Sequence, residues 1–186
     1  MVANIDLAKK RSFLSGTESQ CVIALATFSN LQQLMLEPTP NVQNVFYALQ
    51  SFLNRAAYVA ELIWAPKQSE FAETAEILRV ELGLKETFLI SSRTPTKKLE
   101  HMDEALERWS AQVPRGSIFF TDILAPEAAT RGQGMNVAPL NTFCHFDLNT
   151  GKHYFENFQA DLPALARDIL QIRDMARKLL YRHPSA

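Results

Sequence analysis

His101 is the residue of this chain whose type and surroundings best suit catalysis. Three polar side chains would share one face of a helix with it: Lys97, Glu104 and Arg108. Residues spaced three or four positions apart are neighbours on a helix surface. Because histidine exchanges protons near neutral pH and cations neutralise phosphate, this face has the parts for phosphodiester chemistry, with His101 as the catalytic residue.

The cations that could hold a phosphate beside His101 are Arg93, Lys97, Lys98 and Arg108. The same pattern also suits an ordinary solvent-exposed helix face. In that interpretation Glu104 and Arg108 form an ion pair four residues apart, which stabilises a helix by about 0.2–0.5 kcal/mol. Residue types alone favour the exposed face and leave both interpretations open.

The segment His101–Trp109 also resembles a family pattern. A histidine, a large residue, Asp-Glu, a leucine and a tryptophan follow one another in a group of bacterial proteins that are similar to HEPN domains, the nucleotide-binding domains of higher eukaryotes and prokaryotes. Three further stretches support the resemblance, which spans roughly residues 45–160: Phe52–Ala57, Leu62–Pro66 and Phe120–Ile123.

The resemblance implies a helical bundle that often forms dimers. Many HEPN domains are metal-independent ribonucleases in which an arginine, four to six residues before the histidine, helps to bind the scissile phosphate at the dimer interface. Here the corresponding positions hold Thr96, Lys97 and Lys98, and the nearest upstream arginine is Arg93. A lysine supplies charge without the two-pronged geometry of a guanidinium.

Two functions of different classes are therefore expected. The favoured one is a binding or interaction domain with a HEPN-like bundle, homodimeric and without efficient catalysis, since other family members have lost activity and serve as scaffolds. The alternative is a metal-independent ribonuclease in which His101 acts with nearby basic residues on RNA. RNA or a nucleotide is the corresponding ligand, and no cofactor or metal is expected.

Two histidines near the C-terminal third are a second candidate site. His145 alternates with Asp147 along an expected strand, and a hairpin would bring His153 close to them. Two imidazoles and a carboxylate can bind a metal ion. A polar outer face of an antiparallel hairpin explains the same alternation and is favoured. The loop 131–136 lacks the glycine spacing of a phosphate-binding loop, so we expect a plain connection there.

Apolar periodicity predicts five helices, over residues 17–36, 41–64, 68–82, 95–113 and 161–182. Thr17 and Gln20 have the spacing of a capping box, Gly83 suits a C-terminal cap, and Asp161 suits an N-cap. The buried side of the fourth helix is expected to carry four apolar residues: Leu99, Met102, Leu106 and Trp109.

Before the last helix the pattern changes to alternation. Residues 117–124 are aromatic and β-branched and predict a strand, 125–139 an exposed loop, and 141–148 with 152–158 a hairpin that places Gly151 at positive φ. The expected fold is a single domain (1–186), mostly α. A helical bundle of four to five helices (17–113) carries a small antiparallel hairpin or three-stranded sheet (117–158) before the C-terminal helix (161–182).

Composition agrees with an ordinary globular protein. Of the 186 residues 47% are hydrophobic and 21% charged, and the formal net charge is −1, which gives no whole-chain attraction to nucleic acid or to an anionic membrane. Cys21 and Cys144 have apolar neighbours and are expected to be buried thiols. Neither a signal peptide nor a membrane-spanning segment is recognised, so a cytoplasmic location is expected.

Overall fold

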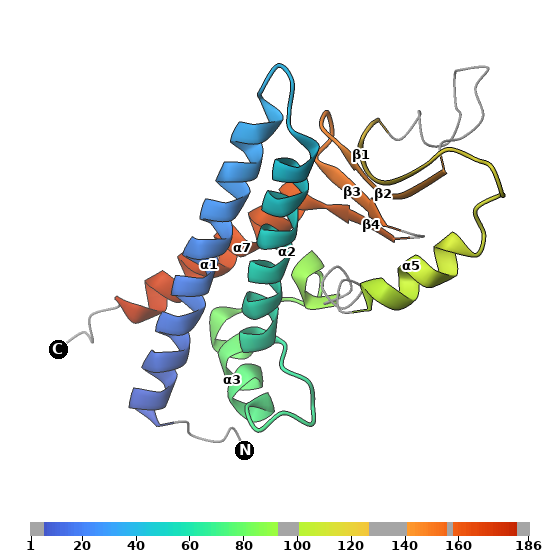
Figure 1. Ribbon diagram of the computed structural model, residues 1–186. Helices are drawn as coiled ribbons and strands as arrows, with labels where there is room; N and C mark the ends of the chain where they lie inside the picture. Colours follow the sequence, from blue (N-terminus) through green and yellow to red (C-terminus); the bar gives the residue numbers. More distant parts are fainter. Residues whose placement is uncertain (1–5, 93–100, 127–140, 156–157, 182–186) are drawn as a thin grey trace.

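The computed structural model describes residues 6–92, 101–126, 141–155 and 158–181. Within these residues the chain is mostly helical, with a four-stranded sheet before the last helix (Figure 1), so the predicted fold class is confirmed. The helices are α1 (Leu7–Met35), α2 (Val42–Ile63), α3 (Ala72–Leu82), the 3-10 helix η1 (Leu89–Ser92), α5 (Met102–Ser110) and α7 (Leu162–Leu180). The strands are β1 (Phe119–Leu124), β2 (Asn141–Asp147), β3 (Lys152–Phe155) and β4 (Phe158–Asp161). None of the described helices has the length and apolar character needed to cross a membrane.

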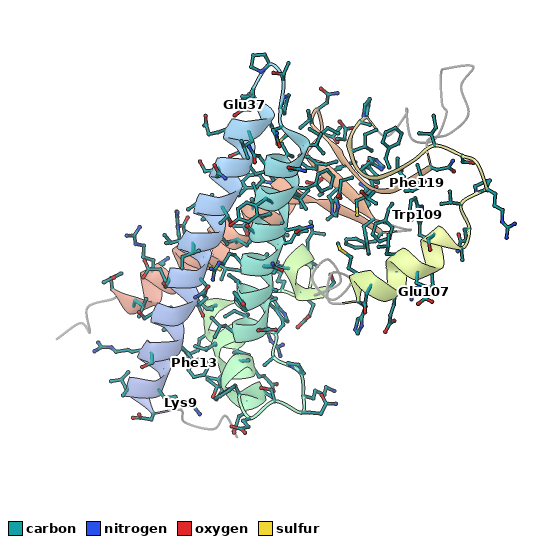
Figure 2. All side chains as sticks on the ribbon, viewed as in Figure 1. Lys9, Phe13, Glu37, Glu107, Trp109 and Phe119 are labelled. Carbon is teal, nitrogen blue, oxygen red and sulfur yellow. The ribbon has the colours of Figure 1, made fainter. Side chains whose placement is uncertain are left out.

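Helix α1 begins ten residues before the predicted start, so the expected capping box at Thr17 is wrong. Asp6 is the N-cap instead, and its carboxylate accepts a hydrogen bond from the Lys9 amide at 3.3 Å. Lys9 and Phe13 lie in the first turns (Figure 2). Thr17 is fully buried inside the helix. The burial of this face outweighs the cost of Gly16 within a helix, which is about 1 kcal/mol.

Helix α2 follows its predicted course and forms the centre of the core. Asn41 caps it by accepting a hydrogen bond from the Asn44 amide at 3.0 Å. Helices α1 and α2 lie side by side, joined by a short turn (Figure 1). The rings of Phe28 and Phe52 meet between them with centroids 5.0 Å apart. A continuous apolar face, the strongest signal in the sequence, therefore becomes the buried face of this helix pair.

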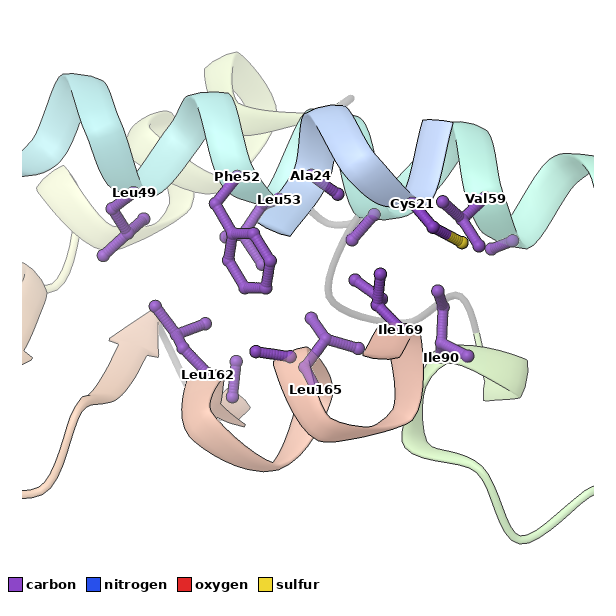
Figure 3. Packing of buried hydrophobic residues seen from close by; sticks show 14 of the residues in the cluster. Cys21, Ala24, Leu49, Phe52, Leu53, Val59, Ile90, Leu162, Leu165 and Ile169 are labelled. Atoms are coloured by element: carbon purple, nitrogen blue, oxygen red, sulfur yellow. The ribbon is translucent and has the colours of Figure 1, made fainter. Parts of the chain in front are cut away.

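Helix α7 closes the core against the α1–α2 pair. Asp161 caps it as predicted and accepts a hydrogen bond from the Ala164 amide at 2.8 Å. Three of its apolar side chains face residues of α1 and α2 (Figure 3): Leu162, Leu165 and Ile169. Because Cys21 and Ala24 of α1 are small and fully buried, they leave room for a close approach of the helices.

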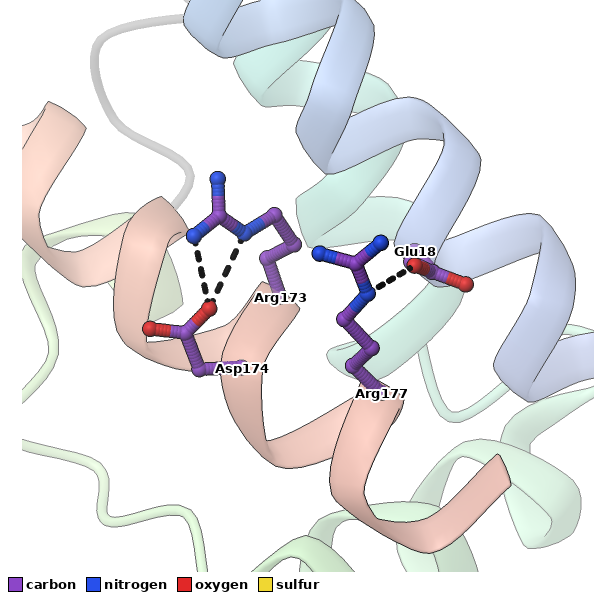
Figure 4. Close-up of polar contacts among 4 residues, drawn as sticks. All are labelled: Glu18, Arg173, Asp174 and Arg177. Carbon is purple, nitrogen blue, oxygen red and sulfur yellow. Dashed lines mark hydrogen bonds and ion pairs between the residues drawn. The ribbon is translucent and has the colours of Figure 1, made fainter. Parts of the chain in front are cut away.

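Polar contacts add an outer layer to the α1–α7 contact. Arg177 of α7 pairs with Glu18 of α1 at 3.1 Å, and Arg173 pairs with its neighbour Asp174 at 2.7 Å (Figure 4). The Arg177 side chain is largely exposed, so solvent screens this pair and it contributes little stability. The apolar seam beneath it holds the two helices together.

The sheet has the strand order β1-β2-β3-β4 and mixes the two pairing modes. β1 is parallel to β2, with Phe119 opposite Asn141, and the other pairs are antiparallel. A parallel pair needs a connection of about a dozen residues or more, which the segment expected as a loop over 125–139 has the length to supply. The parallel pairing was not predicted from the sequence.

Strand β4 was also missed. The predicted strand 152–158 is divided, because β3 ends at Phe155 and β4 begins at Phe158, which lies opposite Phe155 in an antiparallel pair. The sheet therefore has one strand more than the three-stranded alternative. Alternation continues on both sides of the break, so the pattern alone did not locate it.

Gly151 fixes the turn of the β2–β3 hairpin and joins it to α7. Its φ is +67°, as predicted, and its amide donates to the Asp147 carbonyl at 2.8 Å. Its own carbonyl accepts from the Leu162 amide at 3.3 Å. A Cβ at this position would stand 2.8 Å from Cγ of Pro163. Both the backbone conformation and the contact with α7 therefore require glycine.

We predict that Gly151→Ala lowers the free energy of unfolding by about 2 kcal/mol, because it combines an unfavourable φ with a steric overlap. Gly16→Ala is the matched control, since Gly16 lies in a helix with open space around its Cα. This control is expected to raise stability by about 0.5–1 kcal/mol. Urea denaturation of both variants measures the two effects, and equal stabilities would contradict the assignment.

Helix α5 lies beside the sheet and apart from the α1–α2 pair (Figure 1). Trp109 contacts rings from two strands, with centroid distances of 5.9 Å to Phe119 and 5.4 Å to Phe143. Of the predicted buried stripe, Met102 and Trp109 pack against the core, whereas Leu106 is exposed and was wrongly predicted. Leu99 lies outside the described residues.

Candidate functional site

His101 is the N-cap residue of α5, at the start of the described part of the predicted fourth helix. Its side chain forms no capping hydrogen bond and is 66% exposed. Its Nδ1 atom lies 3.8 Å from Oε1 of Glu104, and the other carboxylate oxygen of Glu104 lies 3.6 Å from Arg108. The imidazole is therefore open to solvent, with a carboxylate as its near neighbour.

This arrangement does not concentrate positive charge around His101. Glu104 stands between the imidazole and the Arg108 guanidinium, and Asp103 lies in the same first turn of α5. Carboxylates repel a phosphate and offset the attraction of the arginine. The other predicted phosphate-binding residues, Arg93, Lys97 and Lys98, lie outside the described residues. A phosphate site at His101 therefore stays a prediction.

The hairpin histidines are not on an outer face, and that expectation is wrong. His145, Asp147 and His153 are all buried, so both faces of the hairpin are covered at these positions. His145 lies opposite Tyr154, and His153 opposite Phe146, so alternation directs the two imidazoles to different sides of the sheet. Within the described ranges, no three metal-ligating side chains form a group that could hold an ion.

Each buried polar group of the hairpin has a packing role. The His145 ring stacks on Tyr154 at a centroid distance of 4.1 Å, and the His153 ring meets Phe46 of α2 edge-on at 6.2 Å. Asp147 accepts a hydrogen bond from the Asn149 amide at 2.9 Å and so stabilises the turn. These contacts fix the three side chains within the sheet.

The pKa of His153 is strongly shifted by its surroundings. Burial lowers its pKa from 6.5 to about 4, and the like charge of His145 acts in the same direction. Its Nε2 atom is buried without a hydrogen-bond partner among the described residues. His153 is therefore neutral near pH 7 in the folded chain, and protonation opposes folding.

We predict that this histidine makes the chain less stable in mild acid. The unfolded chain binds a proton at His153 below about pH 6.5, whereas the folded chain does so only near pH 4, so stability falls as the pH drops between these values. His153→Gln, which cannot titrate, is expected to flatten this dependence. Denaturant titrations across the range measure it, with the exposed His101→Gln as control. An unchanged slope for His153→Gln would refute the assignment.

The cysteines are buried thiols, as predicted. Neither belongs to a disulfide, and both lie in the core. Burial raises the pKa of the Cys21 thiol to about 12. A thiol that stays protonated is a poor nucleophile, so Cys21 serves packing between α1 and α7.

A cavity of about 680 Å³ lies between α1, α2 and the connection from α2 to α3. Six of its lining residues supply most of its character: Phe13, Gln20, Arg55, Tyr58, Leu62 and Phe71. This site was not predicted from the sequence. Arg55, Tyr58 and Leu62 are spaced three and four residues apart, which places them on one face of α2. This face could be recognised as part of a cavity only if α1 had been predicted to include Phe13.

A comparison of the chain with protein-family models, with curated proteins and with solved structures finds no match. The resemblance of residues 45–160 to HEPN domains therefore stays a prediction.

Proposed function

We propose that this chain is a protein-interaction domain that forms a homodimer through the outer edge of β1, without efficient catalysis. The observation that carries the proposal is the character of this edge. In the described part of the chain β1 has a neighbour on one side only, which is β2. An unpaired strand edge offers backbone donors and acceptors to another strand.

The side chains along this edge support pairing. Three consecutive large apolar residues are 79%, 56% and 37% exposed: Ile118, Phe119 and Phe120. Edge strands that stay unpaired are normally protected by lysine, proline or a covering element. The segment 117–124 carries only one charged residue, Asp122. Its composition therefore favours pairing over exposure to water.

The strand is also compatible with its own copy. In an antiparallel pair with a two-fold axis at Thr121, Phe119 would face the partner's Ile123. Asp122 would face the partner's Phe120, so the two carboxylates would not be directly opposed. Apolar cross-strand pairs are stabilising, whereas like charges directly opposite each other are destabilising. A second copy of the chain is therefore the occupant that fits this edge.

We predict a species of twice 21.0 kDa for the wild-type chain in multi-angle light scattering. Thr121→Lys is expected to give the 21.0 kDa monomer, because it sets two ammonium groups opposite each other at the axis. Thr121→Val keeps a β-branched side chain and is expected to stay dimeric.

Val80→Lys is the matched control for added charge, since Val80 is an exposed apolar residue of α3. It is expected to remain dimeric. A monomeric wild-type chain, or a dimeric Thr121→Lys variant with native circular dichroism, would contradict pairing through β1.

The alternative function is a metal-independent ribonuclease centred on His101. The one observation in its favour is that the imidazole is open to solvent and could reach a bound RNA. The neighbouring carboxylates of α5 favour the non-catalytic proposal, as does the absence of an arginine at positions 96–98 of the sequence.

We predict no His101-dependent cleavage of RNA in EDTA. Labelled single-stranded RNA is incubated with the wild-type chain and with His101→Ala, and products are resolved on a denaturing gel. Equal background from both proteins is expected. Cleavage by the wild-type chain that His101→Ala abolishes would overturn the non-catalytic proposal in favour of the alternative.

A further inference from the structure

The cavity beside α1 and α2 has the size of a small-molecule site. Its volume of about 680 Å³ lies within the range of about 300–1,000 Å³ typical of ligand pockets. Its walls come from two core helices and from the connection that includes Ala65 and Pro66. It lies on the part of α1 that carries Phe13, at the α3 end of the molecule, away from the sheet (Figure 2).

The apolar part of the wall is aromatic. The rings of Phe13 and Phe71 contact each other at a centroid distance of 5.7 Å and an angle of 52°. Leu62 lines the same space, and Phe71 is about half exposed. Aromatic rings pack well in tilted and offset arrangements, so this wall suits a ligand with a flat aromatic body.

Arg55 places a positive charge in the same wall. Arg55 forms no ion pair with any described residue, and its guanidinium carbon lies 5.5 Å from the centre of the Tyr58 ring. This contact holds the guanidinium while leaving its N–H groups available. A guanidinium binds a carboxylate through two parallel hydrogen bonds.

Gln20 and Glu61 are two further polar residues that line the cavity. Oε1 of Gln20 is buried with no hydrogen-bond partner in the described part of the chain, so turning the amide towards a ligand donor breaks no bond within the protein. Because Arg55 is the one cation among the described residues that line the cavity, we expect a ligand with one carboxylate.

We propose that this cavity binds a small aromatic monocarboxylate, with the carboxylate on Arg55 and the ring against Phe13 and Phe71. An N–H group on the ligand adds a hydrogen bond to Gln20. The cavity is separate from the β1 edge, so this proposal does not depend on the proposed dimer.

The test is isothermal titration calorimetry of the full chain with indole-3-propionate. Binding with a Kd below about 1 mM is expected. Tryptamine, which has a similar ring and the opposite charge, is expected to bind at least about tenfold more weakly. Arg55→Gln should raise the Kd for indole-3-propionate by about tenfold or more, and Leu62→Glu should abolish its binding.

Arg167→Gln is the matched control, because it removes the same charge from an exposed position of α7 outside the cavity. It should bind as the wild-type chain does. The proposal is overturned if the wild-type chain does not bind indole-3-propionate, if tryptamine binds equally well, or if folded Arg55→Gln retains full affinity.

Discussion

The contact of α7 with the α1–α2 pair is the constraint on which the rest of the structure depends. Leu162 and Ile169 are fully buried in this seam, and the small side chain of Ala24 allows the helices to approach closely. The seam also positions other elements. Gly151 packs against the first turn of α7 and so locates the sheet, while Asp168 of α7 accepts a hydrogen bond from the Leu89 amide at 2.6 Å and so locates η1.

The two proposed binding surfaces lie at different ends of this core. The edge of β1 lies on the sheet, whereas the cavity lies near α3 (Figure 1). Each is built on regular elements packed on the core. Occupation of the cavity therefore has no direct path to the edge strand, so we expect the two proposed binding events to be independent. A binding function needs no catalytic residue, which agrees with the exposed, carboxylate-flanked position of His101.

Local chemistry made part of this fold predictable. Asp161 and Gly151 act through neighbours in the chain, so the N-cap of α7 and the turn of the hairpin were evident from the sequence. The start of α1 was missed because Ser15-Gly16 locally suggests a break, and only burial against α2 and α7 overrides it. The buried His145 and His153 were missed because alternation does not reveal whether both sides of a strand are covered. The cavity combines residues from three segments, and no single pattern contains them.

Residue-resolved amide hydrogen exchange over Phe119–Leu124 tests the central claim, pairing through β1, most directly. In a lone edge strand, amides that point towards β2 are protected, and the alternate, outward-pointing amides exchange quickly. Pairing of β1 with a second copy predicts slow exchange at every residue of the strand. Slow exchange confined to alternate residues would show an open edge and contradict the account.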